Sequence, residues 1–238
     1  GTDGGGINVF ENGKRTAIYN KENGKLMSNS VLCSLKDSEN NLWFGTYLGN
    51  ISHYNKQSGE FKTIELEKGK LLDIRTFYED QEKNIWIGTH KGIYVFSLSK
   101  KKVVKHYNTL NCQLPENLVR SIAQDDKGRF WIGTFGGGIG VYTPQMQLIK
   151  KFNQYEGFCS NTINSIYLSK SKQVWVATGE GLVCFPTSDS FDYQIFQREE
   201  GLPNTHIRAI TEDENSNIWV STNTGISCYI IAVSYTHL

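Results

Sequence analysis

The sequence predicts an all-β fold built from one short unit that is repeated along the 238-residue chain. Five tryptophans recur about every 44 residues, each within a stretch of the form NLWFGT or NIWIGT. Apolar and polar residues alternate around them with a period of two, and no helical period is present. Four short antiparallel strands in each repeat are typical of a β-propeller blade. The repeated tryptophans are Trp43, Trp86, Trp131, Trp175 and Trp219.

The first strand of each repeat ends in a polar turn that leads into the Trp strand. Four of the five turns begin with an Asp six residues before the Trp, and the remaining turn has Ser169 there. We expect these side chains to hold the turn through hydrogen bonds to the backbone. A metal site is the alternative, but the aspartates lie one repeat apart and each has a local role. They are Asp37, Asp80, Asp125 and Asp213.

The Trp strand leads through a Gly turn to a third strand that ends in an aromatic residue. Asn50 replaces the Gly in one copy, which fits because Asn tolerates a positive φ better than most residues. The Trp and the aromatic residue are predicted to form the core between successive blades. Cys184 and Cys228 occupy equivalent positions and are expected to be small core residues.

The repeat divides the chain into blade pieces. We expect residues 1–20 to form the outer two strands of one blade, and residues 206–231 the inner strands of another. These ends are expected to be the cut edges of a seven-bladed propeller, the alternative being that they pair and close a strained five-bladed ring. Residues 232–238 do not resemble the repeat and are expected to form an atypical tail. The complete blades are expected at 26–66, 71–108, 117–153 and 161–197.

Composition excludes several classes of function. A formal net charge of +1 argues against a nucleic-acid partner that needs a broad basic surface. No apolar stretch is long enough to span a membrane, so this segment is expected to make no membrane contact. The five cysteines form no CxxC pair, and we expect neither a metal nor a cofactor.

The repeat resembles the two-component regulator propeller repeat, an Asp and polar turn followed by L-W-I-G-T and a turn to Gly. Residues 80–92 read DQEKNIWIGTHKG, residues 125–138 read DDKGRFWIGTFGGG, and the loop EGLPNTHIRAI at 200–210 also matches. The resemblance implies the periplasmic sensor region of a hybrid two-component histidine kinase anchored in the inner membrane, with no catalysis of its own. It also implies an oligosaccharide ligand, signalling to transcription, and as partners the rest of the kinase chain and a second copy of the parent.

Two other functions are open from the residues alone. A protein-interaction scaffold of the WD-repeat kind would carry Gly-His and Trp-Asp dipeptides, and neither occurs in the sequence. An enzyme would need residues that break the repeat and converge on one face. The five histidines occupy different repeat positions, and no catalytic triad or phosphate-binding loop is present.

The candidate ligand site follows from strand direction. Successive strands run antiparallel, so the turn after each repeated Thr and the long loop between blades share one face. The residue just after that Thr varies between repeats, as a ligand-facing position would, although ordinary turn residues also vary. Aromatic residues there could stack on sugar rings, and the polar ones could bond hydroxyl groups. The candidates are Tyr47, His90, Phe135 and Asn223 in the turns, with Asn117, Asn161, Asn204 and His206 in the loops.

Overall fold

The computed structural model describes residues 1–186 and 191–230 of the chain. These residues form β-strands and one 3-10 helix, η1, at Gln154–Glu156. The strands pair in antiparallel sheets, and four of the sheets contain four strands each. The predicted all-β fold of four-stranded antiparallel blades is therefore confirmed. No described helix has the length and apolar character that crossing a membrane requires.

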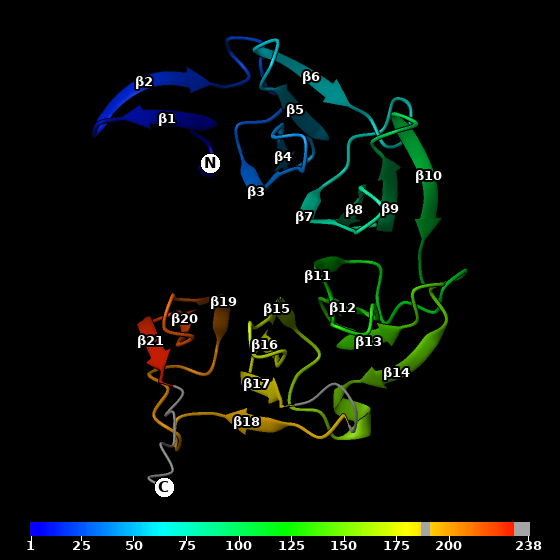
Figure 1. Ribbon diagram of the computed structural model, residues 1–238, viewed down its shortest axis with the longest axis vertical. Helices are drawn as coiled ribbons and strands as arrows, with labels where there is room; N and C mark the ends of the chain where they lie inside the picture. The colour runs from blue at the N-terminus through cyan, green and yellow to red at the C-terminus, as the bar shows by residue number, and fades with distance from the viewer. Residues whose placement is uncertain (187–190, 231–238) are drawn as a thin grey trace, which may run out of the picture. The chain divides into compact units, whose positions relative to one another are not determined.

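The chain divides into two compact units, Gly1–Ile122 and Ala123–Leu238. The first unit contains a two-stranded sheet followed by two complete blades, in which each strand pairs with the next along the chain (Figure 1). The two-stranded sheet consists of β1 (Ile7–Glu11) and β2 (Lys14–Tyr19). The blades are β3 (Val31–Lys36), β4 (Leu42–Thr46), β5 (Ile51–Asn55) and β6 (Glu60–Ile64), then β7 (Ile74–Glu79), β8 (Asn84–Thr89), β9 (Gly92–Ser97) and β10 (Lys102–Tyr107).

The second unit begins within β11 and contains the strands of two more blades and a three-stranded sheet. The first of these blades is β11 (Val119–Gln124), β12 (Phe130–Thr134), β13 (Ile139–Tyr142) and β14 (Leu148–Phe152). The next blade is β15 (Ile163–Leu168), β16 (Val174–Thr178), β17 (Gly181–Phe185) and β18 (Gln194–Phe196). The last sheet is β19 (Ile207–Glu212), β20 (Ile218–Thr222) and β21 (Gly225–Tyr229).

The number of blades differs from the seven expected of the parent. The described chain supplies four complete blades, with a two-stranded sheet before them and a three-stranded sheet after them. A seven-bladed propeller therefore stays a prediction about a longer chain. Residues 232–238, predicted to form an atypical tail, lie outside the described residues.

The turn after each Trp strand is fixed by the repeated Thr. Oγ1 of Thr134 donates a hydrogen bond to the carbonyl of Gly138 across the turn, at 2.9 Å. Gly138 has a φ of +83°, and a Cβ atom there would lie 2.0 Å from the carbonyl oxygen of Phe152, so only Gly fits. Asn50 takes the equivalent place with a φ of 61°, which confirms the predicted positive φ.

The repeated Asp holds its turn and also bonds the Trp. Oδ1 of Asp37 accepts the backbone N–H groups of Glu39 and Asn41 at 3.0 and 2.8 Å, which confirms the predicted turn contacts. Its Oδ2 atom accepts the indole Nε1–H of Trp43 at 2.8 Å. Most buried indole N–H groups in proteins have an acceptor, and here the Asp supplies it as the ring enters the core. The same indole bond joins Asp80 to Trp86, Asp125 to Trp131 and Asp213 to Trp219.

Within each unit, a buried Trp packs against an aromatic residue of the next blade. In the first unit the rings of Trp43 and Phe96 lie 5.4 Å apart in an edge-to-face arrangement. In the second unit Trp131 meets Phe185 at 4.8 Å. Rings at these distances bury a large apolar area, so the contacts form the core between blades as predicted.

The connections leave each blade at two opposite ends. One end, the loop face, carries the turns after the repeated Thr residues and the longer loops between blades. The other end, the turn face, carries the Asp turns and the turns between the third and fourth strands. Both faces follow from the antiparallel order of the strands.

Candidate functional site

The loop face differs from the turn face in its exposed residues. Every large hydrophobic residue that is exposed in a described connection between two strands lies on the loop face. The described connections of the turn face expose none of this kind. Large exposed apolar groups favour contact with a ligand or partner, so the candidate site lies on the loop face. The residues are Met27, Tyr47, Leu48, Leu71 and Leu110 in the first unit, with Phe135 and Tyr155 in the second.

Tyr47 follows Thr46 in the turn between β4 and β5. Its backbone N–H donates to the carbonyl of Ser30 at 3.0 Å, which fixes the turn against the preceding loop. The ring is 47% exposed. The guanidinium carbon of Arg75 lies 5.8 Å from the ring centroid, within the range of a cation–π contact. The ring is thus held in place and still reaches solvent.

Asp73 connects Tyr47 to His90, the other predicted residue in this unit. The Asp73 carboxylate is nearly buried and accepts a hydrogen bond from the backbone N–H of Leu48 at 2.9 Å. Its second oxygen pairs with Nη2 of Arg75 at 2.9 Å. The Asp73 backbone N–H donates to Nδ1 of His90 at 3.2 Å. Because Nδ1 is the acceptor, the neutral His90 ring carries its proton on Nε2, which is a hydrogen-bond donor.

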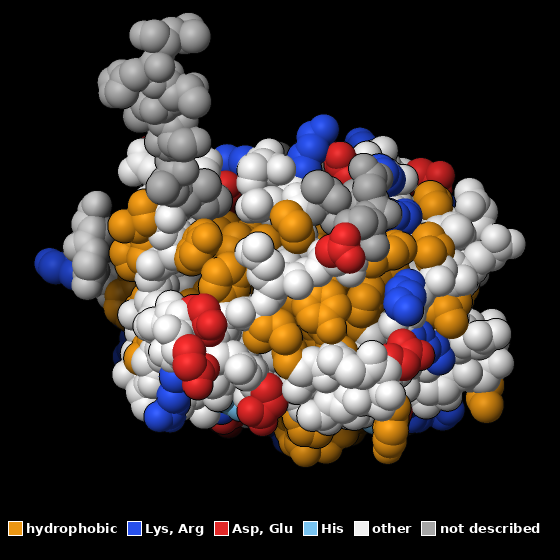
Figure 2. Space-filling model, turned by 90° about the horizontal axis from the view of Figure 1, so that it is seen from below, with side chains coloured by type: hydrophobic (Ala, Val, Ile, Leu, Met, Phe, Trp, Pro, Cys, Tyr) orange, Lys and Arg blue, Asp and Glu red, His pale blue; other side chains and the backbone are white. Residues whose placement is uncertain are grey.

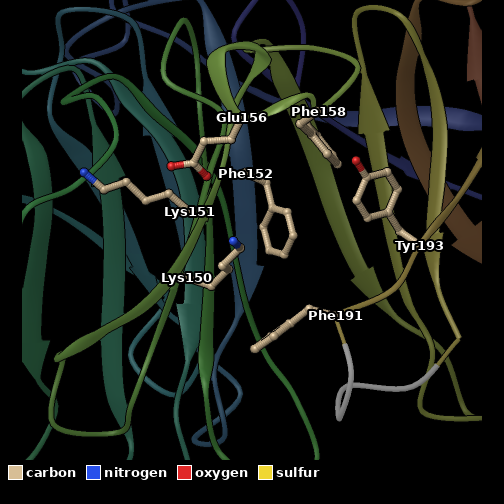
Figure 3. Close-up of a pocket in the computed structure, with 7 residues that line it drawn as sticks. All are labelled: Lys150, Lys151, Phe152, Glu156, Phe158, Phe191 and Tyr193. Carbon is tan, nitrogen blue, oxygen red and sulfur yellow. The ribbon is translucent and has the colours of Figure 1, made fainter.

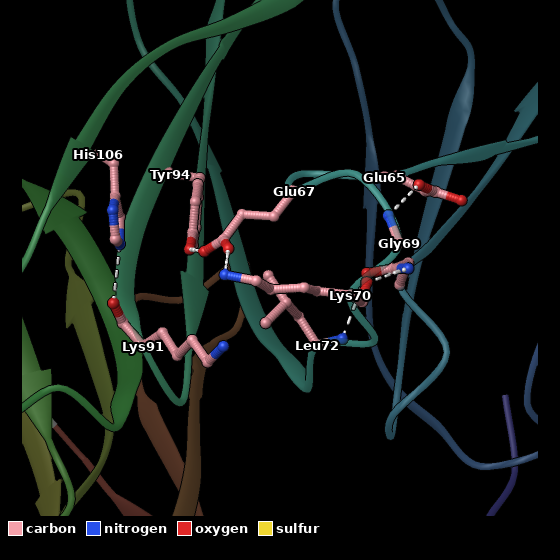
Figure 4. Close-up of polar contacts among 9 residues, drawn as sticks. Glu65, Glu67, Gly69, Lys70, Leu72, Lys91, Tyr94 and His106 are labelled. Carbon is pink, nitrogen blue, oxygen red and sulfur yellow. Dashed lines mark hydrogen bonds and ion pairs between the residues drawn. The ribbon is translucent and has the colours of Figure 1, made fainter.

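A polar network on the same loop holds the neighbouring part of the loop face (Figure 4). The Glu67 carboxylate pairs with the Lys70 ammonium and accepts a hydrogen bond from the Tyr94 hydroxyl. The bond from Lys70, followed by that from Tyr94, lowers the pKa of Glu67 to about 2. His106 stacks on Tyr94 with ring centroids 4.0 Å apart. These contacts fix the loop that leads to Asp73.

The predicted asparagines in the loops serve the backbone. Oδ1 of Asn117 accepts the backbone N–H of Thr109 at 2.9 Å. The backbone carbonyl of Asn117 accepts the N–H of Gly92 at 2.8 Å. Oδ1 of Asn161 likewise accepts the N–H of Gln154 at 2.8 Å. Two loops thus use Asn to close the same turn, a structural role that accounts for its presence.

The remaining predicted residues belong to the second unit and are held by separate neighbours. Oδ1 of Asn204 accepts the backbone N–H of His206 at 2.8 Å, and the His206 ring lies beside Asn164. Oδ1 of Asn223 accepts Nε–H of Arg208 at 2.8 Å. Phe135 forms an isolated bridge with Thr162, and its ring is half exposed.

Sequence reasoning missed Asp73 and Arg75, which join the predicted Tyr47 and His90 into one site. A signal was present in the repeat. The residue just before the first strand is Ser30, Leu118, Thr162 or His206 in the other copies, and Asp73 is the carboxylate at this position. A charged residue that departs from its equivalents marks a position with its own role.

A separate hollow of about 420 Å³ lies on the second unit (Figure 3). The rings of Phe152, Phe158 and Tyr193 face one another there, and the ammonium group of Lys150 lies 5.9 Å from the Phe152 centroid. Hydrophobic side chains also reach the surface in the view of Figure 2, among charged ones. Phe191 closes one side of the hollow and packs on Trp131, so much of this cluster is core.

Comparison with known proteins identifies the repeat. The profile of the two component regulator propeller family matches residues 25–48, 70–91, 113–136 and 201–224. Each match runs from a loop between blades, through an Asp turn, to the turn after a repeated Thr. No curated protein matches the chain.

Solved structures agree with this assignment. The extracellular domain of a hybrid two-component system from B. thetaiotaomicron is 73% identical, with a TM-score of 0.92 over 97% of this chain. The chain covers 31% of that protein's length. A second such domain from the same organism is 21% identical (TM-score 0.72, 86% of this chain and 30% of that one). PorZ, a surface component of the type-IX secretion system of Porphyromonas gingivalis, shares the fold at 19% identity (TM-score 0.77, 96% and 36%).

The four matched repeats and the 73% identical structure converge on one family. The features that the profile matches are the ones that build the blades, namely the Asp turn, the buried Trp strand and the Thr turn. The chain therefore belongs to the two-component regulator propeller family.

Proposed function

We propose that the chain is a ligand-sensing segment of a hybrid two-component sensor histidine kinase and that it detects carbohydrate fragments. The observation that carries the proposal is the 73% identity to an extracellular domain of such a system over 97% of the chain. Since the chain spans about a third of that protein, the kinase, the membrane anchor and a seven-bladed ring belong to the proposed longer protein. Its proposed location is the periplasm.

The Tyr47 site on the loop face has the chemistry that sugar recognition requires. The exposed Tyr47 ring offers an apolar surface on which a sugar ring can stack. Nε2–H of His90 and the charged groups of Asp73 and Arg75 offer hydrogen-bond partners for hydroxyl groups nearby. Asp73 is hydrogen-bonded to the turn that carries Tyr47, to His90 and to Arg75, so a ligand that shifts one of these groups is expected to shift the others.

The proposed segment binds and does not react. A bound ligand would be read out as a shift between two arrangements of the longer sensor, which requires different affinity for the two states. Saturable turnover of a polysaccharide by the purified chain, abolished by a point mutation, would overturn this part of the proposal.

A protein-interaction scaffold is the second candidate, and the exposed apolar side chains of the loop face favour it. Met27, Leu48 and Leu71 are each about half exposed and offer no group that would bind sugar hydroxyls. A partner protein docking there would bury them. Loss of partner binding in Leu48→Asp, with glycan binding unchanged, would separate this function from sugar sensing.

The test of the sensor proposal is a glycan-binding screen on the purified chain, followed by titration of the best ligand. Tyr47→Ala and His90→Ala are each expected to weaken binding at least about tenfold, the scale expected of a central contact residue. Phe135→Ala tests the turn of the second unit. Tyr155→Ala is the matched control, because this ring is also exposed but lies outside the Tyr47 site. Unchanged binding in Tyr47→Ala and His90→Ala would place the site elsewhere.

A further inference from the structure

His53 breaks the repeat inside the third strand of its blade. The equivalent residues in the other copies are small and apolar, and none carries a titratable ring. The His53 ring packs edge-on against Trp43, with centroids 4.7 Å apart. A polar ring where every other blade has an apolar side chain calls for a reason beyond packing. The equivalents are Val9, Val95, Val141, Cys184 and Cys228.

His53 lines a cavity of about 320 Å³ in the first unit, between blade β3–β6 and blade β7–β10. The inner wall is apolar and comes from both blades, and the rim comes from turns of the turn face and from the adjoining strands β5 and β6. This volume and this division into apolar wall and polar rim are typical of sites for small molecules. The wall consists of Trp43, Ile64, Phe96 and Leu98, and the rim of Glu39, Asn41, Asn55, Ser58, Lys62 and Lys101.

The hydrogen-bonding groups that the fold leaves unused in this cavity are mainly donors, and the Glu39 carboxylate at the rim is the unused acceptor among them. Among the described residues, none bonds the ring nitrogens of His53, the amide N–H groups of Asn55 or the hydroxyl of Ser58. Neither Lys62 nor Lys101 forms an ion pair with a described residue. By contrast, Asp37 behind the wall is nearly buried, and its oxygens already bond Asn41 and the Trp43 indole.

We propose that this cavity binds a small ring compound that carries a carboxylate. The apolar wall accommodates the ring, and His53, Lys62 and Lys101 donate to the carboxylate at the rim. A uronic acid and an aromatic acid share this chemistry, and the experiment below distinguishes them. The site lies on the turn face, apart from Tyr47, so it goes beyond the sensing role proposed for the loop face.

The experiment is calorimetric titration of the full chain with D-glucuronate and with benzoate. D-glucose and benzyl alcohol are the neutral counterparts of these two probes. At least one acid is expected to bind, about tenfold or more tightly than its neutral counterpart, because hydrogen bonds to a charged group are the strong ones. The acid that binds shows whether the ligand is a uronic acid or an aromatic acid. The proposal fails if neither acid binds, or if the neutral compounds bind equally well.

His53→Val is the decisive variant, because Val is the residue that three other copies place there and the blade is expected to fold. This change should weaken binding of the acid about tenfold or more, while the thermal unfolding temperature stays close to that of the parent chain. The double variant Lys62→Met with Lys101→Met should weaken binding of the acid as well. His90→Ala is the matched control and should bind the acid normally, even if loop-face glycan binding is lost. Unchanged acid binding in His53→Val overturns the proposal.

The pH dependence gives a second readout. Burial lowers the pKa of His53. The negative charges of Asp37 and Glu39 oppose this shift, the positive charge of Lys62 adds to it, and Lys101 lines the same cavity. A bound carboxylate favours protonated His53, so affinity should rise as the pH falls towards that pKa. This rise should be absent in His53→Val. An identical pH profile for the variant and the parent chain would contradict a role for His53 in binding.

Discussion

Blade β11–β14 and blade β15–β18 bury equivalent Trp rings. The indole N–H has a hydrogen-bond acceptor in the first of these blades and none among the described residues in the second. Oδ2 of Asp125 accepts Nε1–H of Trp131 at 2.9 Å, whereas Ser169 stands in place of the Asp in the next blade. Ser169 is too short to reach the ring, and the buried Nε1 of Trp175 has no hydrogen-bond partner among the described residues. Both rings are almost completely buried.

The two turns nevertheless have the same backbone. The N–H of Asp125 donates to the carbonyl of Arg129 at 3.0 Å, and the N–H of Ser169 donates to the carbonyl of Gln173 at 2.9 Å. Oγ of Ser169 accepts the N–H of Gln173 at 3.0 Å, as the Asp oxygen does in its own turn. The turn therefore needs only a short acceptor, and the second carboxylate oxygen serves the indole.

The largest loss of stability is expected when the turn of blade β11–β14 is given the Ser that blade β15–β18 has at the Asp position. Asp125→Ser removes the indole acceptor and breaks the ion pair of Asp125 with Arg129, which has an N–O distance of 2.8 Å. Leaving buried polar partners unpaired should lower the free energy of unfolding by about 3 kcal/mol. Urea denaturation measures this loss. Asp126→Ser is the control next in sequence, and a loss within about 0.5 kcal/mol in Asp125→Ser would contradict the interpretation.

The next largest effect is a difference in stability loss between removing the Trp131 indole and removing the Trp175 indole. Trp131→Phe leaves Asp125 without one of its donors, whereas Trp175→Phe removes an N–H that has no acceptor. Both changes shrink the ring equally, so the difference isolates the hydrogen bond. We expect Trp131→Phe to cost about 1–2 kcal/mol more than Trp175→Phe in urea denaturation. Equal losses would show that the indole bond does not contribute to stability.

A smaller gain is expected from restoring the acceptor. Ser169→Asp should place a carboxylate beside Nε1 of Trp175 and raise the free energy of unfolding by about 1 kcal/mol. Ser171→Asp, two residues along the same turn, adds the same charge without reaching the indole and should be near neutral. A destabilised Ser169→Asp protein would mean that the blade has adapted its packing to the Ser.

The smallest effect is a change in proton affinity at an exposed copy of the pair. The indole of Trp219, followed by the Asn217 side chain, lowers the pKa of Asp213 to about 2. The carboxylate therefore stabilises the fold at pH values above its unfolded pKa of about 3.9, and this contribution is lost as the pH falls towards about 2. Trp219→Phe should raise the pKa, measured by NMR titration of the Asp213 carboxyl group. An unchanged pKa would exclude the indole as the main cause.

Local sequence determined the blades. The Asp turn, the Thr turn and the positive φ of Asn50 involve residues a few positions apart, so their chemistry is readable from one repeat. The departure at Ser169 was also visible. Its consequence for Trp175 was not, because the missing bond matters only when the ring is buried against Tyr229 of the following sheet.

The sites depended on contacts between blades. Variation after the repeated Thr predicted Tyr47 and His90 as single residues, but these lie in different blades and meet only through Asp73 in the loop between them. His53 stands out in the sequence as a departure from Val and Cys. Its cavity exists only because a second blade supplies Phe96 and Leu98 opposite it. A repeat specifies what lies within one blade, while packing of successive blades decides which side chains face one another across the gap.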